Sequence, residues 1–377
     1  LKKSWEQGEI YKYLALSLYN NMPSSKLTVG IVGLPNVGKS TLFQALTKNK
    51  VEASNYPFCT IDPNVGVVAV PDDRLDKLTK LSKSAKTIPT TIEFVDIAGL
   101  VKGASEGEGL GNKFLSNIRE VDAIVQVIRH FTDKNVTHVH GDINPEYDKD
   151  IINLELIMAD LDVVTKHLDK VVSKMKGPYE KVLDQEKALM EKAKTQLEDN
   201  KMLNSLELDE EEAKLIKQLN LLSIKPIIYL YNIDESDVGE DIGLPDNSIS
   251  ICAKTEAELA ELDETEAKEY MKELGISASG LDNLITASYK LLNLITFITT
   301  GPEETKAWTI TNGTKGPQAA GVIHTDFEDG FIRAEAIDWQ LLLDDGGWNQ
   351  AKDAGHMRME GKEYIMQDGD TVHFHFN

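Results

Sequence analysis

The chain has 377 residues, which is long for one ordinary domain and predicts two or three. Its formal net charge of −22 repels phosphate backbones, so contact with nucleic acid requires a local basic patch, and DNA binding is not expected. No apolar run approaches the ~18 residues of a membrane span, and residues 1–22 make a poor secretory signal. Two distant cysteines, Cys59 and Cys252, favour a reducing compartment over disulfides or zinc, so a cytoplasmic protein is expected.

The first two-thirds of the chain alternates strand-like and helix-like segments. Short apolar runs predict strands at residues 27–33, 65–70, 91–97, 123–128, 226–231 and 249–252. A helix is expected directly after the first strand, over residues 39–47. Strands separated by helical stretches predict an α/β domain with a mostly parallel sheet.

A long helical segment interrupts this series of strands. Apolar residues at alternating steps of three and four form a seam at Leu154, Ile157, Leu161, Val164, Leu168, Val171 and Met175. Gly177 and Pro178 end this helix, and a less regular seam follows through Val182 and Leu197. We expect an antiparallel, coiled-coil-like arm of two helices inserted into the α/β domain. The alternative is two amphipathic helices packed flat on its body.

After an amphipathic helix over residues 281–294, the pattern changes to short strands separated by glycine and acidic turns. These strands are predicted at residues 308–310, 319–324, 331–336 and 371–376, and they indicate a small α+β domain. The predicted division is an extension without assigned role (1–25), an α/β domain in two parts (26–149 and 223–296), the inserted arm (150–222) and the C-terminal domain (297–377).

A phosphate-binding motif follows the first predicted strand. Residues Gly33–Ser40 (GLPNVGKS) match G-x-x-x-x-G-K-[ST] and lie between a strand and a helix, the context that the motif requires. Backbone N–H groups of such a loop surround phosphate oxygens at the positive end of the helix dipole. The lysine contacts the β- and γ-phosphates, and the serine hydroxyl binds magnesium. The candidate nucleotide-binding residues are Asn36, Val37, Gly38, Lys39, Ser40 and Thr41, with Lys39 also a candidate catalytic residue.

Two further segments predict contacts with magnesium and the γ-phosphate. Asp96 stands at the end of a predicted strand and begins the sequence DIAG, in which the carboxylate holds magnesium through water and the Gly99 N–H senses the γ-phosphate. Thr60 lies in a turn-rich loop, where its hydroxyl is expected to complete the magnesium shell in the triphosphate state. The alternative for Thr60 is a hydroxyl that bonds the nearby backbone.

The base-reading position departs from the guanine-binding sequence N-K-x-D. Residues Asn232–Glu235 read NIDE, so isoleucine replaces the lysine that flanks the base and glutamate replaces the aspartate that reads guanine. The Asn232 amide offers both a donor and an acceptor, which suit adenine. Cys252 and Ala253 lie where a second base-side loop is expected. The candidate base-contacting residues are Asn232, Ile233, Glu235, Cys252 and Ala253, in a site poorly suited to guanine.

At this point the chain resembles the Obg-like ATPase (YchF) family of Obg-related NTPases. The resemblance covers residues 26–377 and rests on GLPNVGKST (33–41), NYPFCTIDPN (55–64), DIAGLVKGASEGEGLGN (96–112), NIDE (232–235), AELAEL (257–262) and PQAAGVIHTDFEDGFIRAE (317–335). It implies a preference for ATP over GTP, a helical arm inserted in the nucleotide-binding domain, and a C-terminal TGS domain of β-grasp form. It also implies association with the ribosome, here taken as the large subunit.

Hydrolysis requires a group that orients the attacking water. Where Ras-like enzymes carry glutamine after D-x-x-G, this chain has Leu100, whose side chain cannot hydrogen-bond, so slow intrinsic turnover is expected. The family pattern implies that His138 takes this role; the alternative is a solvated loop histidine. Asn36 resembles the asparagine that binds potassium in some related GTPases. The alternative for Asn36 is a side chain that caps the local backbone.

A row of lysines on the predicted arm is the candidate basic patch, comprising Lys166, Lys170, Lys174 and Lys176. The resemblance favours RNA contact, whereas the residues alone favour a solvated face mixed with Asp162 and Asp169. The sequence thus predicts a magnesium-dependent, ribosome-associated ATPase that works as a slow switch. The alternatives are an Obg-type GTPase and a nucleotide-gated scaffold whose hydrolysis is incidental.

Overall fold

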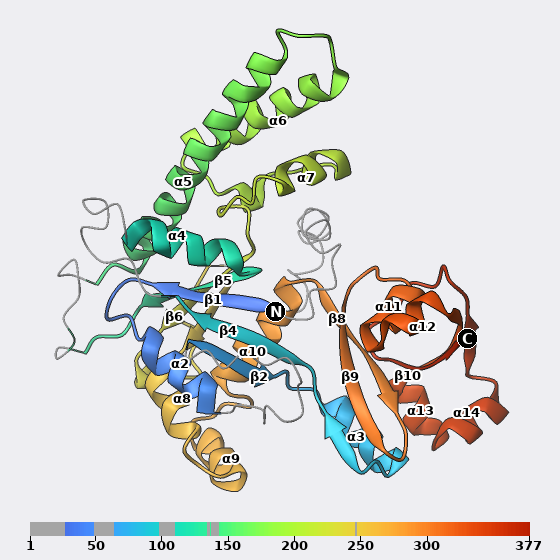
Figure 1. Ribbon diagram of the computed structural model, residues 1–377. Coiled ribbons are helices and arrows are strands. Elements are labelled where there is room, and N and C mark those ends of the chain that lie inside the picture. The colour runs from blue at the N-terminus through green and yellow to red at the C-terminus, as the bar shows by residue number, and fades with distance from the viewer. Residues whose placement is uncertain (1–26, 49–63, 98–109, 134–135, 137–142, 246) are drawn as a thin grey trace.

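The structure, a computed structural model, describes residues 27–48, 64–97, 110–133, 136, 143–245 and 247–377. These residues form two six-stranded sheets, with strand orders β2-β4-β1-β5-β6-β7 (sheet A) and β11-β10-β12-β8-β9-β3 (sheet B). A helical arm leaves the body beside sheet A, and sheet B lies at the other end of the molecule (Figure 1). Among the described residues, no helix combines the length and apolar character needed to cross a bilayer.

Sheet A confirms the predicted α/β domain. Its parallel strands are β1 (Thr28–Gly33), β4 (Thr91–Asp96), β5 (Ala123–Arg129), β6 (Ile227–Asn232) and β7 (Ser248–Ile251), and β2 (Val65–Ala69) runs antiparallel to β4. All seven residues of β5 are buried, as expected for a central parallel strand that helices cover on both faces. The short apolar runs in the sequence thus correctly predicted a mostly parallel sheet.

Helices cover both faces of sheet A. They are α2 (Lys39–Lys48), α4 (Leu110–Glu120), α8 (Ala253–Leu259) and α10 (Gly280–Leu291), while α9 (Glu264–Glu273) lies beyond α8, away from the sheet (Figure 1). In Figure 1, α4 lies on one side of the sheet, and α2 and α8 lie on the other. Leu42 and Leu46 of α2 and Ile118 of α4 are fully buried in the core of this domain. The sheet edge where β1, β5 and β6 end is therefore supported by a buried apolar core.

The arm consists of α5 (Pro145–Lys174) and α6 (Lys181–Glu198), followed by η2 (Leu203–Ser205) and α7 (Glu210–Lys217). Figure 1 shows α5 and α6 running side by side away from sheet A. They share an apolar core of their own, with Val164 of α5 against Leu189 and Leu197 of α6. Ile157, Leu161, Val164 and Leu168 of the predicted seam belong to this core. Leu154 of that seam and Val182 of the second predicted seam are instead 45% and 56% exposed. The two-helix arm that the heptad pattern predicted is present.

Sheet B and its helices form the predicted C-terminal α+β domain. Its elements are β8 (Leu294–Thr300), β9 (Glu304–Thr311), α11 (Gly316–Ile323), α12 (Thr325–Asp329), β10 (Phe331–Asp338), α13 (Trp339–Asp345), α14 (Trp348–Ala354), β11 (Arg358–Glu360) and β12 (Asp370–Phe376). The strand predicted at residues 319–324 was wrong, because this segment belongs to helix α11. Pro317 lies in its first turn, and the small side chains of Ala319 and Ala320 let the helix pack closely on the sheet.

One short segment of the α/β region joins sheet B. Between β2 and β4 the chain forms α3 (Asp73–Ser82) and β3 (Lys86–Ile88), and β3 pairs in parallel with β9. Leu75 and Leu78 of α3 are buried with Ile298 and Ile337 of the C-terminal domain. The sequence placed this segment in the first part of the nucleotide-binding domain, since nothing in its pattern shows which core its apolar face meets.

Candidate functional site

A cavity of about 790 Å³ lies at the carboxyl edge of sheet A. Four segments surround it: the loop between β1 and α2, the residues after β5, the residues after β6, and the start of α8. Its lining residues are Asn36, Gly38, Lys39, Ser40, Thr41, Phe131, Asp133, Val136, Asn232, Ile233, Asp234, Glu235, Cys252, Ala253, Lys254, Ala257, Glu258 and Glu261. The carboxyl edge of a parallel sheet is the usual location of a ligand site in such folds.

The loop that links β1 to α2 has the backbone of a phosphate cradle. Asn36 and Gly38 have positive φ angles of 63° and 97°. A Cβ atom at position 38 would lie 2.2 Å from the Asn232 amide nitrogen, so only glycine fits there. Helix α2 begins at Lys39, directly after this turn, and its N–H groups and dipole favour an anion at the loop. Ser40 and Thr41 are exposed on its first turn.

Lys39 and Asp96 face each other beside this loop. The Lys39 ammonium donates to the backbone oxygens of Gly33 and Leu34, at 2.8 and 2.9 Å. Burial lowers the pKa of Lys39 and raises the pKa of Asp96, and each charge opposes the shift of the other. Asp96 Oδ1 is buried and accepts no hydrogen bond from any described residue. A buried carboxylate oxygen of this kind suits a magnesium ion or a water molecule bound to one.

Asn232 fastens the cradle to the base-side loop. Its amide nitrogen donates to the Val37 oxygen at 2.9 Å, and its amide oxygen accepts from the Ala253 N–H at 3.0 Å. Only 5% of the residue is exposed. The amide keeps a second N–H and a second oxygen lone pair, and these are the groups left for a base. The structure thus brings together Val37, Asn232 and Ala253, which were predicted from separate parts of the sequence.

The other predicted base-side residues lie on the same wall. Ile233 and Cys252 are buried in one small apolar cluster that lines the cavity. The Glu235 carboxylate pairs with the Lys254 ammonium at 2.9 Å, and both side chains are largely exposed at the rim. Asp234, the third residue of NIDE, instead accepts from the Thr132 N–H and hydroxyl and so ties the loop after β5 to the loop after β6.

The loop after β5 contributes residues that the sequence analysis missed. Arg129, which is 1% exposed, donates to the backbone oxygens of Phe131, Asp133 and Val136, and its guanidinium lies 4.3 Å from the centre of the Phe131 ring. These three residues line the cavity. The sequence offers one signal for this loop as a whole: it follows a predicted parallel strand, and the carboxyl ends of neighbouring parallel strands lie at one edge of the sheet. A buried arginine that donates only to loop oxygens fixes that wall of the cavity.

Three predicted site residues lie outside the described part of the chain. They are Thr60, Gly99 and His138. Their roles remain predictions.

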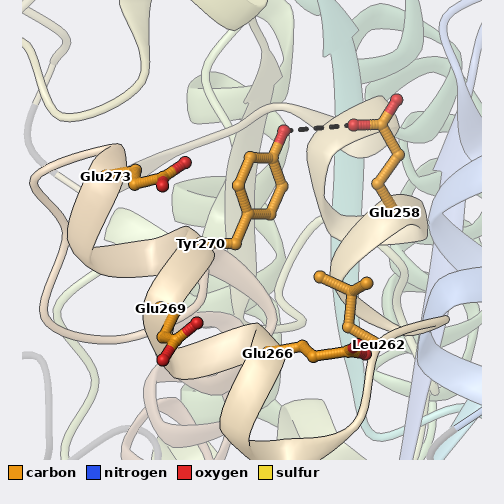
Figure 2. Close-up of a pocket in the computed structure, with 6 residues that line it drawn as sticks. All are labelled: Glu258, Leu262, Glu266, Glu269, Tyr270 and Glu273. Atoms are coloured by element: carbon orange, nitrogen blue, oxygen red, sulfur yellow. Dashed lines mark hydrogen bonds between the residues drawn. The ribbon is translucent and has the colours of Figure 1, made fainter.

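A second cavity, of about 430 Å³, lies between α8 and α9 (Figure 2). Its walls carry the carboxylates of Glu258, Glu266, Glu269 and Glu273, and the Tyr270 hydroxyl donates to Glu258 at 3.2 Å. This concentration of negative charge repels phosphates. Among the described cavities, the one at the end of sheet A is therefore the candidate site for a polyphosphate.

This arrangement defines the class of P-loop nucleoside triphosphatases: a glycine-rich loop leads into a helix that begins with a lysine, and an aspartate ends a neighbouring strand. The family model described as "50S ribosome-binding GTPase" matches residues 28–232. A second model, for the C-terminal domain of YchF GTPases and described as a protein of unknown function, matches residues 294–377.

The chain belongs to the YchF family. It is 53% identical to the "Ribosome-binding ATPase YchF" of Bacillus subtilis over 93% of this chain and 99% of that protein. It is 51% identical to the protein of the same name from Escherichia coli O157:H7, over 92% of this chain and 98% of that one. The solved structure of the Schizosaccharomyces pombe "YchF GTPase" matches with a TM-score of 0.84 and 40% identity, over 94% of this chain and 99% of that chain. These matches confirm the family and the fold that the sequence motifs predicted.

Proposed function

We propose that this protein is a magnesium-dependent ATPase that binds the ribosome and works as a slow nucleotide switch. The observation that carries this proposal is the phosphate cradle at Gly33–Thr41, which opens α2 beside Lys39 and Asp96 in a cavity large enough for a nucleotide. Relatives at 51–53% identity over nearly their whole length are named ribosome-binding ATPases. A cytoplasmic location is consistent with that name.

The P-loop residues act by positioning and neutralising the triphosphate. N–H groups from Asn36 to Thr41 hold phosphate oxygens, and the Lys39 ammonium moves from its two backbone acceptors to the β- and γ-phosphates. The phosphates offset the burial that lowers the pKa of Lys39, so the lysine stays charged in the complex. Ser40, Thr60 and Asp96 are the residues assigned to magnesium, which supplies charge neutralisation at the β- and γ-oxygens. The buried, unpaired oxygen of Asp96 supports that assignment.

The base-side wall favours ATP over GTP. Buried Ile233 replaces the lysine of N-K-x-D, and Glu235 carries its carboxylate one methylene farther out, where it pairs with Lys254. Asn232 retains one N–H for a purine nitrogen, and Cys252 and Ala253 line the same wall of the cavity. The relatives are named both ATPase and GTPase, so an Obg-type GTPase is the competing reading.

We assign the orientation of the attacking water to His138, because Leu100 cannot hydrogen-bond to water. Arg129 holds Phe131, Asp133 and Val136 at the cavity wall, and His138 lies two positions after Val136 in the sequence. Asn36, at the mouth of the cavity, is the proposed potassium ligand. A potassium ion there neutralises charge that an arginine finger neutralises in other enzymes.

We assign contact with the large ribosomal subunit to local basic patches rather than to the acidic bulk of the protein. Lys166, Lys170, Lys174 and Lys176 are exposed along one stretch of α5 and its end, although Lys166 pairs with Asp162. The C-terminal domain, which the resemblance assigns to the TGS class, is a second candidate surface. Neither a membrane nor DNA is a proposed partner.

Co-sedimentation with ribosomes tests the switch. Wild-type protein is expected to bind ribosomes differently with a non-hydrolysable ATP analogue than with ADP, and Lys39→Ala is expected to lose that difference, because it cannot hold the phosphates. The control Lys83→Ala changes an exposed lysine at the end of α3 and should behave as wild type. Equal sedimentation of the wild type in both nucleotide states would contradict the switch. Lys39→Ala protein that still binds ribosomes as the wild type does would support the scaffold alternative.

A further inference from the structure

Two histidines and a glutamate gather on one face of sheet B, far from the nucleotide cavity in the fold. Glu335 lies on β10, and His373 and His375 lie on β12. One ligand atom from each side chain lies within 4.8 Å of the other two. Imidazole nitrogens together with a carboxylate are donors that zinc and neighbouring transition metals prefer.

The sheet register places these three side chains on the same face. Glu335 is directly opposite His373 in the antiparallel ladder, and His375 is two residues farther along β12. Side chains two apart on a strand point to the same face. The intervening residues, Ala334 on β10 and Phe374 on β12, are buried in the core on the other face. The three polar side chains are therefore not needed to build that core.

Their contacts leave donor atoms available. His375 Nε2 is buried and makes no hydrogen bond with any described residue, although Glu335 Oε1 lies 3.2 Å away. The rings of His373 and His375 have centres 5.0 Å apart, and His373 is exposed. A buried imidazole nitrogen without a hydrogen bond, beside a carboxylate and a second imidazole, is an arrangement that a shared cation satisfies.

We propose that Glu335, His373 and His375 bind one divalent transition-metal ion of the zinc type. Ligand atoms around tetrahedral zinc lie about 3.3 Å apart, and His375 Nε2 and Glu335 Oε1 already lie 3.2 Å apart. Three protein ligands leave a fourth position for water or another donor. Met359, which pairs with Glu335 from β11 and is 56% exposed, lies on the same face as a neighbouring soft donor.

The two nitrogen donors separate this site from the magnesium site at the P-loop. Magnesium prefers an all-oxygen octahedral shell, whereas the cluster offers two nitrogens and one carboxylate. Because the ligands come from β10 and β12, a bound ion would link the two strands and stabilise sheet B against unfolding, by an amount that grows with the logarithm of the ion concentration.

Calorimetric titration of Zn²⁺ into the full-length protein, with excess magnesium and ADP present to fill the P-loop site, tests the proposal. Wild-type protein is expected to show a saturable site that His373→Ala and His375→Ala each weaken by about tenfold or more. The control His356→Ala removes a histidine of the same domain that pairs only with Asp345, and it should leave that site unchanged.

A second readout keeps the test independent of folding. His373 is exposed, so His373→Ala is expected to melt at the wild-type temperature in chelator and to lose the rise in melting temperature that Zn²⁺ gives the wild type. In ¹⁵N-histidine spectra, Zn²⁺ should shift the ring signals that disappear in the His373 and His375 variants. Zinc binding of equal strength in the wild type and both variants would overturn the proposal.

Discussion

Two segments of the chain leave the nucleotide-binding sheet and return to it, a short excursion and a long one. The short excursion packs into the second sheet, whereas the long one packs mainly on itself. The short one, residues 73–88 between β2 and β4, forms α3 and β3 and is built into the second sheet. The long one, residues 145–217 between β5 and β6, forms the arm and has its own apolar core. Length therefore does not decide which excursion is independent; the location of the buried apolar side chains does.

The short excursion connects sheet A to sheet B through a shared apolar core, which predicts that the two sheets unfold as one unit. Leu78 is fully buried among residues of the C-terminal domain. Arg74 donates to Asp72 at 2.7 Å and to Asp368 at 2.8 Å, so one guanidinium joins the start of α3 to the turn before β12.

The long excursion is attached to the body mainly at its base. The Asp160 carboxylate accepts from the N–H groups of Leu222 and Ser223, and also from the Ser223 hydroxyl at 2.6 Å. Nearer the sheet, Tyr229 exchanges a hydrogen bond with Asn153 at 3.1 Å. The outer part of the arm is then free to meet a partner without disturbing the nucleotide cavity.

The largest effect is expected for Leu78→Ala. It leaves a cavity in the core that the two sheets share, and should cost about 2–5 kcal/mol of unfolding free energy. Urea unfolding should be followed in a Trp5→Phe background, where the remaining tryptophans, Trp308, Trp339 and Trp348, lie in the C-terminal domain. Tryptophan fluorescence then reports on sheet B and nucleotide release on sheet A, and the two transitions should shift together. Leu341→Ala, at a 42% exposed leucine of α13, is the control. Separate transitions for the two probes would show that the sheets are not one unit.

A smaller loss, of about 2 kcal/mol, is expected for Asp160→Ala, because three buried donors lose their acceptor. Hydrogen exchange should rise in residues 150–222 and stay unchanged around β1 and α2. Asp162→Ala, which removes an exposed pair with Lys166, should have little effect. Faster exchange at the P-loop in Asp160→Ala would mean that the arm is not a separate module.

The same carboxylate predicts a dependence on pH. Burial raises the pKa of Asp160 above its ordinary value of 3.8, against the opposing effect of its hydrogen bonds. The folded chain therefore keeps a proton that the unfolded chain has released, and this group's contribution to stability falls as the pH rises above 3.8. Asp160→Asn cannot ionise, so its stability relative to wild type should increase with pH between 3.8 and the raised pKa of the folded chain, as measured by urea titrations. A flat difference would contradict the assignment.

The smallest effect is expected for Tyr229→Phe, which removes only the hydrogen bond to Asn153. A loss of about 1 kcal/mol is expected, with faster hydrogen exchange confined to the base of α5. Tyr179→Phe, at an 80% exposed residue beyond the end of α5, serves as the control for the arm. A larger loss than that of Asp160→Ala would reverse the order of the two anchors.

Local pattern was enough to predict much of this molecule. The apolar runs gave sheet A, the heptad seam gave the arm, and Gly33–Ser40 predicted a loop that the structure shows at the mouth of a cavity. Long-range packing was not predictable in the same way. The amphipathic face of α3 does not reveal that it meets sheet B, and Ala319 and Ala320 carry no periodic signal that separates a packed helix from a strand.

The residues of the site show the same difference between local pattern and long-range packing. Residues in contiguous motifs, such as Lys39 and Asn232, were found from the sequence and lie together at the cavity. Arg129 was missed, because its importance depends on burial and on three loop oxygens that only the folded chain brings around it.

Isothermal titration of the purified protein with magnesium and either ATP or GTP tests the central claim most directly. One saturable ATP site is expected, with GTP weaker by about tenfold or more, equivalent to about 1.4 kcal/mol of binding free energy. GTP that binds as tightly as ATP would contradict the reading of the base-side wall at Asn232–Glu235. No saturable binding of either nucleotide would contradict the assignment of the cradle at Gly33–Thr41.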